Sequence, residues 1–556
     1  MKRFLLFVLA AAMATAPAFA QDDEKKDKPK GNLSGSFETN TIYYMVDKAL
    51  GTTPQEGRFG SNNYLKLDYT KGRLSIGVQF EGYFPILDGF DWKSYGQGKK
   101  FFLANKYVRW QDNNFTVHVG DIYEQFGSGL AFRSYEDRAL GFNNSIEGVF
   151  ASYNFNGYVQ IKGLYGRPRL YDFYASSWVR GADLSLSIND MVGSWDWILS
   201  LEGSYVSRYK TKGDLTDQFL QIAGTSGTNV NLYSGRLNFE YSGFHLSGEY
   251  VNKSKDFTGG IDFDPESMQE IYIMKPGNAI LVEAGYTGKG LALLGTFRRI
   301  EDMTTTLTYG TTADPFNLGI GNSLNFIPSL TRQYTYLLAN LHPYLVADQL
   351  TGGEIGGQFD AFYTMRSQND RRKKWTFHLN FSTFYTLGKN GTKSQLLWQD
   401  LNFDVERQWN RKLKTTFLYT WQQNNSHLLA GNNPVNTHTF VYDMTYKIDT
   451  YNSFRLELQY LYSPHKTYLP QFNEGDWAAA LFEYNFAPNW SFYASDMYNI
   501  DETKIHYYNV GLSYSKGRTR VQLSYGRNRE GYICSGGVCR LTPAYTGFNL
   551  SLTSSF

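Results

Sequence analysis

The chain has 556 residues and a formal net charge of +2, and 17% of its residues are aromatic, including 43 Tyr and 40 Phe. A net charge this close to zero argues against nucleic acid as a partner. The mean hydropathy is nevertheless negative, at −0.43. This combination is typical of a protein in which apolar and polar residues alternate, with apolar faces turned to lipid and aromatic girdles at the interfaces.

The first 20 residues, MKRFLLFVLAAAMATAPAFA, predict a signal peptide, because two basic residues precede an apolar stretch that ends on small-x-small. The apolar stretch is too short to span a bilayer, and no second stretch of helical membrane length follows. No cysteine lies near the predicted cleavage site, which argues against a lipoprotein anchor. Residues 21–30 carry charges of both signs and predict a solvated periplasmic tail. We therefore expect an exported protein without a membrane helix.

Residues 31–556 predict an all-β fold, in which apolar and polar residues alternate along each strand. The pattern is clearest in LSIGVQFEGYF (74–84), WTFHLNFSTFY (375–385) and SFRLELQYLY (453–462). Charges lie on only one face of these segments. A soluble sheet would need a second layer to cover the apolar face, whereas a single-sheet barrel in lipid needs none. We therefore predict a transmembrane antiparallel β-barrel.

The connections between the predicted strands alternate between tight and long. Tight links are expected at 70–73, 111–114, 154–157, 241–243, 287–290, 409–412, 487–490 and 515–518, and longer loops at 123–144, 207–228, 254–276 and 302–350. Outer-membrane barrels have short periplasmic turns and long extracellular loops, and soluble sandwiches lack this asymmetry. We expect about 24 strands (22–26), an even number, with both termini periplasmic and the barrel in the outer membrane of a Gram-negative bacterium.

The chain ends in TGFNLSLTSSF, a regular alternating strand whose last residue is the aromatic Phe556. An even barrel with a periplasmic N-terminus must end in a strand that returns to the periplasm. This segment resembles the β-signal by which the assembly machinery recognises a barrel strand. We therefore expect the barrel assembly machinery as a partner, together with the lipid bilayer.

Both cysteines, Cys534 and Cys539, lie in CSGGVC between the last two predicted strands. In an exported protein, a pair separated by four residues across Gly-Gly is most simply a disulfide that pins a hairpin loop. A metal site would need more ligands nearby, and none is close in sequence. A disulfide is therefore expected, with a redox or metal role as the alternative.

Several stretches resemble an uncharacterised family of Bacteroidota outer-membrane proteins that is defined only as a domain of unknown function. They are residues 120–144, 325–344, 353–364, 475–499 and 520–540. The resemblance covers nearly the whole mature chain and implies an outer-membrane location and a barrel fold. It implies no substrate and no catalytic residues.

The loop at 123–144 is the richest candidate for a functional element. Polar and aromatic groups surround the turn-prone FGSGL in this loop, namely Tyr123, Glu124, Gln125, Arg133, Tyr135, Glu136 and Arg138. This composition suits a loop that folds into a wide lumen and binds or filters solutes. The alternative is that its charges merely pin a plug loop to charged strand faces.

A second candidate is the loop at 302–350. Leu330, Tyr334, Leu337, Leu338 and Leu341 recur there at helical spacing, which predicts a short helix that lies inside the barrel or caps its mouth. The alternative is that residues 333–345 form further strands of the barrel.

Strand parity also predicts charges on the inner wall. The residues concerned are Arg236, Glu240, Glu249, Arg455, Glu457 and Arg520. An Arg that faced lipid near the midplane would cost about 2–4 kcal/mol. Residues of this parity are therefore expected to face the lumen rather than the acyl chains. Mixed signs would also let plug loops dock by paired charges.

The expected function is a pore or channel that passes solutes across the outer membrane, because a barrel this large leaves an aqueous lumen unless it is filled. The alternative is a loop-plugged barrel that acts as a binding or scaffold component of an envelope complex. The eight histidines are dispersed, and no local arrangement of nucleophile, base and carboxylate stands out. We expect no enzymatic activity, no metal and no cofactor. No plug domain precedes the first strand, which argues against a TonB-dependent transporter.

Overall fold

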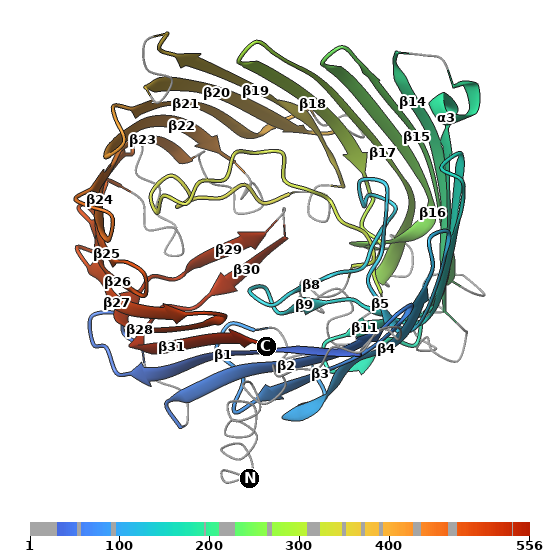
Figure 1. The fold of residues 1–556 in the computed structure, drawn as a ribbon, viewed down its shortest axis with the longest axis horizontal. Helices are drawn as coiled ribbons and strands as arrows, with labels where there is room; N and C mark the ends of the chain where they lie inside the picture. Colours follow the sequence, from blue (N-terminus) through green and yellow to red (C-terminus); the bar gives the residue numbers. More distant parts are fainter. Residues whose placement is uncertain are drawn as a thin grey trace, which may run out of the picture.

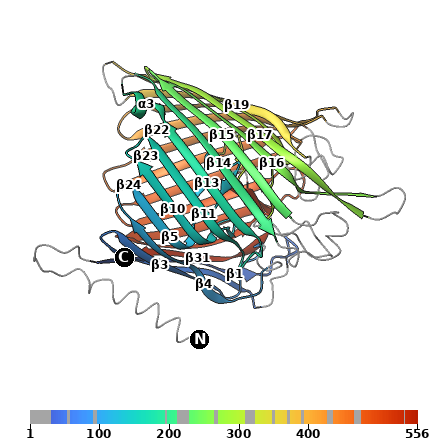
Figure 2. The same ribbon diagram turned by 90° about the vertical axis from the view of Figure 1, so that its right-hand side faces the viewer.

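The computed structural model describes residues 31–52, 57–90, 96–193, 196–210, 228–263, 270–307, 323–346, 352–368, 373–388, 393–425, 435–464, 475–535 and 538–556. The predicted signal peptide and periplasmic tail lie outside these residues. Almost all of the described chain is β-strand or turn, and it forms a barrel whose strands are tilted across its wall (Figures 1 and 2). None of the described helices is long and apolar enough to cross a membrane.

The wall of the barrel contains most of the strands. They are β1 (Asn32–Met45), β2 (Phe59–Lys71), β3 (Leu74–Tyr83), β4 (Phe101–Gln111), β5 (Phe115–Ile122), β10 (Ile146–Phe155), β11 (Val159–Leu170), β13 (Trp178–Ser187), β14 (Ile198–Lys210), β15 (Thr228–Tyr241), β16 (Phe244–Phe263), β17 (Glu270–Gly288), β18 (Leu291–Glu301), β19 (Glu354–Arg366), β20 (Lys374–Thr386), β21 (Leu396–Gln408), β22 (Leu413–Asn424), β23 (Val435–Lys447), β24 (Asn452–Tyr462), β25 (Trp477–Phe486), β26 (Trp490–Asn499), β27 (His506–Lys516), β28 (Thr519–Asn528) and β31 (Tyr545–Ser555).

Short elements lie in the connections. They are β6 (Gln125–Phe126), β7 (Phe132–Arg133), β8 (Glu136–Asp137), β9 (Phe142–Asn143), β12 (Phe173–Tyr174), α3 (Ile188–Val192), β29 (Gly531–Ser535) and β30 (Val538–Thr542). The helix α3 ends at Gly193, whose φ of +75° is the left-handed conformation that glycine tolerates best.

The ring is closed and contains 24 strands among the described residues. The main sheet has 25 strands, of which β12 pairs only with β11 and lies outside the ring. The last wall strand, β31, pairs with β28 on one side and with β1 on the other. The pairing with β1 continues past the end of β31, because the backbones of Gly35 and Phe556 exchange two hydrogen bonds of 3.0 and 3.1 Å. The predicted barrel of about 24 strands is confirmed.

The outer surface of the ring is apolar. Large apolar side chains of one parity are exposed on most wall strands, for example Val108, Val119, Val149, Leu184, Leu201, Leu237, Phe297, Phe359, Leu379, Phe403, Phe417, Leu458, Phe482, Leu512, Leu523 and Leu550. Many of their neighbours of opposite parity are polar and buried, for example Asp360, His378 and Glu457. A soluble protein has the reverse arrangement, so this surface is built to lie in lipid.

The two ends of the barrel differ in the length of their connections. At one end, here called the tight-turn end, strands are joined by short links such as 72–73, 242–243, 289–290 and 517–518. At the other end, the long-loop end, the connections include 123–145 and 302–353. Both chain ends of the wall, the start of β1 and the end of β31, lie at the tight-turn end.

Two expectations about the loops were wrong. Residues 254–276 are not a long loop, because β16 continues to Phe263 and β17 begins at Glu270, so that the hairpin extends beyond its neighbours (Figure 2). Neither a helix nor a strand forms between β18 and β19 in the described residues. The expected helix around Leu338 is reduced to single turns, with Asn340 and Leu341 donating to the carbonyls of Tyr336 and Leu338.

Candidate functional site

Three connections that fold back into the barrel from the long-loop end form the candidate functional site. They are the first plug loop (residues 123–145), the second plug loop (residues 302–307 and 323–346) and the β29–β30 hairpin. Figure 1 shows them inside the ring, where β8 and β9 are teal, the second plug loop is yellow and the hairpin is red. Whatever passes through the barrel must pass them.

Apolar side chains attach the first plug loop to the wall. Phe126, Leu130 and Phe132 are completely buried and belong to one cluster with inward-facing valines, among them Val206 and Val251. The tilted rings of Phe126 and Phe132 lie 5.2 Å apart, across the short β6–β7 pairing. The loop therefore has a small hydrophobic core of its own, formed against an otherwise polar inner wall.

The tip of the first plug loop needs glycine. Gly127 has a φ of +56°, and a Cβ added there would lie 2.5 Å from Cδ of Arg236. The next residue, Ser128, donates its backbone N–H to Oε2 of Glu249 at 3.0 Å. The other carboxylate oxygen of Glu249 accepts from the hydroxyl of Ser234 at 2.8 Å. Two of the predicted wall charges thus lie directly against the plug.

Arg138 ties the same loop to β1 and β2. Its guanidinium lies 2.8 Å from Glu38 and 3.4 Å from Glu136, and it covers the ring of Tyr64 at 4.6 Å. Glu136 also accepts a hydrogen bond of 2.7 Å from Gln79 of β3. These side chains hold the β8–β9 turn against the wall.

The other predicted residues of this loop have separate partners. Glu124 pairs with Lys162 of β11 at 3.2 Å, and the Tyr123 hydroxyl accepts from Asn143 at 3.0 Å. Gln125 is exposed; its side chain donates to the nearby carbonyl of Gly127 and its backbone N–H to Glu124. The seven predicted residues therefore do not converge on one centre. Most of them instead brace the loop.

Arg133 and Tyr135 face the second plug loop. The Arg133 guanidinium lies between two rings, 4.3 Å from the centroid of Tyr135 and 4.0 Å from that of Phe326. The two plug loops also share backbone hydrogen bonds of 3.0 Å, from Arg133 to Leu324 and from Phe326 to Gly129. They form one body rather than two independent flaps.

Asn325 joins the plug loops from within. Its Nδ2 donates to the carbonyls of Leu130 at 3.1 Å and Met303 at 3.0 Å, and its Oδ1 accepts from the backbone N–H of Thr305 at 2.9 Å. Only 6% of the residue is exposed. Because one buried amide satisfies three backbone groups, it makes the loops interdependent.

The second plug loop runs along the inner wall and is bound at many points. Lys253 of β16 donates to the carbonyl of Thr304 at 2.8 Å, and Arg208 of β14 to Thr306. Farther along, Arg298 donates to the carbonyl of Pro328. Basic side chains of the wall thus satisfy backbone carbonyls that would otherwise be buried without a partner.

The end of this loop crosses β20 to β24. Gln422 donates to the carbonyl of Ala339 at 3.1 Å, and Gln459 accepts from the backbone of Leu338 at 2.9 Å. The Tyr344 ring stacks on Phe384 at 5.3 Å. Burial raises the pKa of the Tyr344 hydroxyl well above its usual range, so the group stays protonated and donates to Glu354.

Three ion pairs on the inner wall are almost completely buried. They are Arg169–Glu81 at 3.0 Å, Arg208–Asp256 at 2.9 Å and Arg298–Glu354, with side-chain exposures of 2% or less. Arg169 also donates to the carbonyls of Tyr171 and Ala104. Buried pairs require such additional bonds, since the desolvation of two charges is costly.

The burial of inward-facing side chains falls from the long-loop end to the tight-turn end. On β2, Tyr64 is 4% exposed. The side chain of Lys66, the next inward-facing residue toward the tight turns, is 44% exposed. On β20 the values for His378 and Lys374 are 1% and 40%. The plug therefore fills the long-loop half, and the inner wall of the tight-turn half is lined with solvated charges.

The predicted wall charges follow this division. Arg236 is buried and pairs with Asp183 at 2.5 Å and Glu202 at 2.7 Å. Glu240 and Arg520, near the tight turns, are exposed.

On β24, the inward-facing charges Glu457 and Arg455 follow the same gradient of burial. Glu457 is 4% exposed, and Arg455 bridges it to Asp443 with contacts of 2.6 and 2.9 Å.

The side chains of Cys534 and Cys539, which the predicted disulfide would join, lie outside the described part of the structure. The backbones of Cys534 and Cys539 lie opposite one another in the β29–β30 register. The structure shows no disulfide among the residues that it describes, and the bond stays a prediction.

Some residues of the site carry no local signal in the sequence. His378 bridges Asp360 and Asp404, with distances of 3.1 and 2.8 Å, under the second plug loop. Its parity predicted an inward position, but both partners lie on neighbouring strands.

The described residues contain no group of three or more His, Cys, Asp or Glu side chains arranged to hold a metal ion. The inward course of the β29–β30 hairpin also had no sequence signal.

The barrel is similar to several solved structures at low sequence identity. The P pilus usher (PapC) translocation pore matches with 9% identity and a TM-score of 0.43, over 94% of this chain and 99% of that one. The siderophore receptor PirA from Pseudomonas aeruginosa matches with 10% identity and a TM-score of 0.41, over 96% and 81% of the two chains. The copper transporter OprC matches with 10% identity and a TM-score of 0.41, over 97% and 83%.

No curated protein matches the chain. A family model described as "Family of unknown function (DUF6029)" matches residues 1–556. Since the match spans the whole sequence, the chain belongs to the DUF6029 family of unknown function.

Proposed function

We propose that this protein is an outer-membrane channel for small solutes, in which the barrel's own plug loops narrow the long-loop half of the lumen. The observation that carries the proposal is the change in burial along the inner wall. Solvated charges such as Lys66 and Lys374 line the tight-turn half, and the plug begins beyond them. A barrel that served only as a scaffold would not need a tight-turn half lined with solvated charges.

The size of the ring supports a channel. Eight strands leave room for little more than side chains, whereas barrels of 16 or more strands enclose a channel or a plugged lumen. With 24 wall strands, loops rather than wall side chains decide whether solutes pass. Beside their apolar contacts, the loops are tied to the wall by hydrogen bonds and ion pairs, which can exchange for water when a loop moves.

In this proposal the tight-turn end faces the periplasm and the long-loop end faces outward. Short periplasmic turns and long external loops are the rule for bacterial barrels. The β31 strand would then end in the periplasm at Phe556, where the assembly machinery can recognise it. The two cysteines would lie on the outer side, in an oxidising environment that favours a disulfide.

A second candidate function is a loop-plugged barrel that binds a partner in the envelope. The observation that favours it is the nearly complete burial of Arg298 and Glu354, beside the second plug loop. The pair joins the wall strands β18 and β19, and the plug completes its hydrogen bonds, since Arg298 also donates to the carbonyl of Pro328 and Glu354 accepts from the Tyr344 hydroxyl. Undocking the loop would leave a buried charge pair without these bonds, which favours a permanent plug.

The experiment that separates the two candidates uses the wild-type protein in planar bilayers and in liposomes. The channel predicts discrete openings, and liposomes that swell in small neutral sugars but not in large dextrans. The absence of both conductance and swelling would refute the channel. Isolation of a stoichiometric partner from native membranes would then establish the scaffold.

A further inference from the structure

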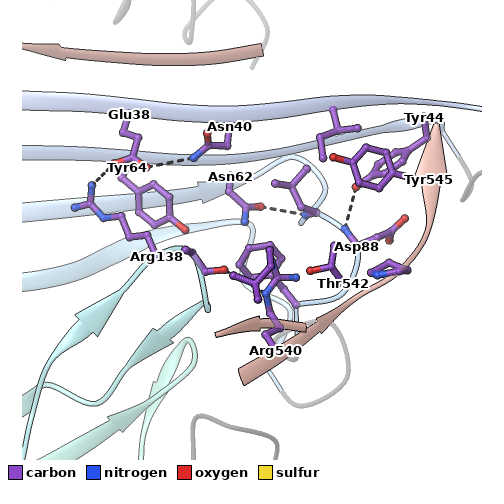
Figure 3. A pocket seen from close by; sticks show the side chains of 16 residues that line it. Glu38, Asn40, Tyr44, Asn62, Tyr64, Asp88, Arg138, Arg540, Thr542 and Tyr545 are labelled. Carbon is purple, nitrogen blue, oxygen red and sulfur yellow. Dashed lines mark hydrogen bonds and ion pairs between the residues drawn. The ribbon is translucent and has the colours of Figure 1, made fainter. Parts of the chain in front are cut away.

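A pocket of about 320 Å³ lies at the seam where the first and last strands close the barrel. The inner faces of β1 and β2 form one wall. The opposite wall is formed by three segments that reach into the lumen: the connection after β3, the first plug loop and the β29–β30 hairpin (Figure 3). The volume is at the lower end of the range for small-molecule sites.

Most of the lining is apolar and aromatic. Tyr44, Tyr64, Phe90 and Tyr545 contribute rings, and Leu87 is one of the aliphatic side chains between them. Tyr44 and Tyr545 meet edge to face, with centroids 5.6 Å apart. Rings held in this way are rigid surfaces against which the apolar face of a ligand can pack.

The charges of the pocket are balanced within its own walls. Glu38 pairs with Arg138 at 2.8 Å. Arg540 covers the Phe90 ring at 4.0 Å and donates to backbone carbonyls, including that of Gly89 at 3.0 Å. Since Asp88 is the other acidic lining residue, two acids face two arginines. The site therefore has no excess charge with which to select an ion.

Two polar atoms of the pocket have no hydrogen-bond partner in the described part of the chain. Asn62 is 1% exposed, and its Oδ1 accepts from the backbone N–H of Leu87 at 3.1 Å, but its Nδ2 is unpaired. In Figure 3 this nitrogen is turned away from the strand and toward the loops. The hydroxyl of Thr542, on the opposite wall, is also buried and unpaired. Leaving such groups unpaired costs about 1–3 kcal/mol each, and native proteins avoid it.

We propose that this pocket binds a neutral sugar unit. A pyranose ring presents apolar C–H faces to the aromatic walls and hydroxyl groups at its rim. A hydroxyl oxygen can accept from Asn62 Nδ2, and another hydroxyl can pair with Thr542. A charged ligand would instead add an uncompensated charge to a pocket whose acids and arginines are balanced. The inference rests on the proposed function, because it names the class of solute that the channel admits.

The experiment is calorimetric titration of the full-length purified barrel with glucose, maltose and raffinose, in a detergent without a sugar headgroup. At least one of these sugars should bind, and glucuronate and glucosamine should bind more weakly. Asn62→Asp keeps the acceptor for Leu87 but removes the free donor, so it should weaken binding about five- to tenfold. Thr542→Trp, which fills the pocket, should abolish binding.

The matched control is Asn509→Asp on the inner face of β27. Its Oδ1 likewise accepts a hydrogen bond, from the Tyr493 hydroxyl at 3.0 Å, and it does not line the pocket. This variant should bind as the wild type does. The proposal is overturned if no neutral sugar binds, if charged sugars bind better, or if binding is unchanged in both pocket variants. Titration does not depend on conductance, so a failure of the channel would be seen separately.

Discussion

Asn325→Ala should release the plug without weakening the barrel wall. Within the described part of the chain, the Asn325 side chain bonds only to groups of the two plug loops: the carbonyls of Leu130 and Met303, the backbone N–H of Thr305 and the hydroxyl of Ser323. The strand register of the wall does not involve it. The variant should therefore assemble normally and migrate in a heat-modifiable way, like the wild type, while its plug loops separate more readily.

The magnitude follows from the groups that lose a partner. The carbonyl of Met303 still accepts from the Thr305 hydroxyl at 3.2 Å. The carbonyl of Leu130 and the N–H of Thr305 lose the bonds that Asn325 supplies, at about 1–3 kcal/mol each, or about 2–6 kcal/mol together. Since 1.4 kcal/mol is a factor of ten, even the lower figure raises the undocked population about 30-fold.

Single-channel recording gives the assay, because undocked plug loops should appear as openings whose share of the recording time rises about 30-fold or more. Limited trypsin digestion gives an independent readout, since Arg133 becomes accessible when the loops separate. The matched control is Asn485→Ala at the tight-turn end, where the side chain donates to Glu483 at 2.9 Å and does not contact the plug loops among the described residues. Unchanged openings together with unchanged digestion would refute the assigned role of Asn325.

Three further predictions concern the wall and the hairpin. Deletion of Phe556, or its replacement by Asp, should lower outer-membrane levels, because this residue ends the strand that closes the ring; unchanged abundance on immunoblots would contradict this. A cysteine in place of Arg455 should react quickly with a water-soluble thiol reagent, and one in place of Glu457 should react slowly because the plug covers it. A cysteine in place of Leu458 should hardly react, because it faces lipid. Equal labelling of all three would be inconsistent with the strand parity. The two cysteines of the β29–β30 hairpin should resist alkylation until a reductant is added, and mass spectrometry that finds both alkylated beforehand would exclude the disulfide.

The local pattern was sufficient for the wall, because strand parity depends on neighbours along the chain. In SFRLELQYLY, the alternation predicted which side chains face lipid, and Leu458 and Glu457 lie on opposite faces as expected. The same reasoning failed for residues 254–276. They contain several polar and turn-forming residues, which favour a loop. In the structure, β16 and β17 continue through much of this segment because the two strands pair with each other by backbone hydrogen bonds.

The second plug loop shows how tertiary contacts override local periodicity. The apolar spacing of Leu330, Tyr334, Leu338 and Leu341 predicted a helix. In the structure, the loop instead follows the curved inner wall, where Leu338 and Leu341 lie in a cluster with Trp477. Side chains of the wall satisfy its backbone groups, so a helix is not required to pair them.

The sequence by itself determined the alternation and most of the segments that form wall strands, since both depend on residues that are close along the chain. Only the tertiary structure decided which polar groups meet inside the ring. Glu81 and Arg169 pair although 88 positions separate them, and Asn325 reaches Leu130 across 195 positions. Such contacts form when loops fold back into a lumen whose shape the whole ring defines. No local period encodes them, and the pocket at the strand seam exists only where all of these segments meet.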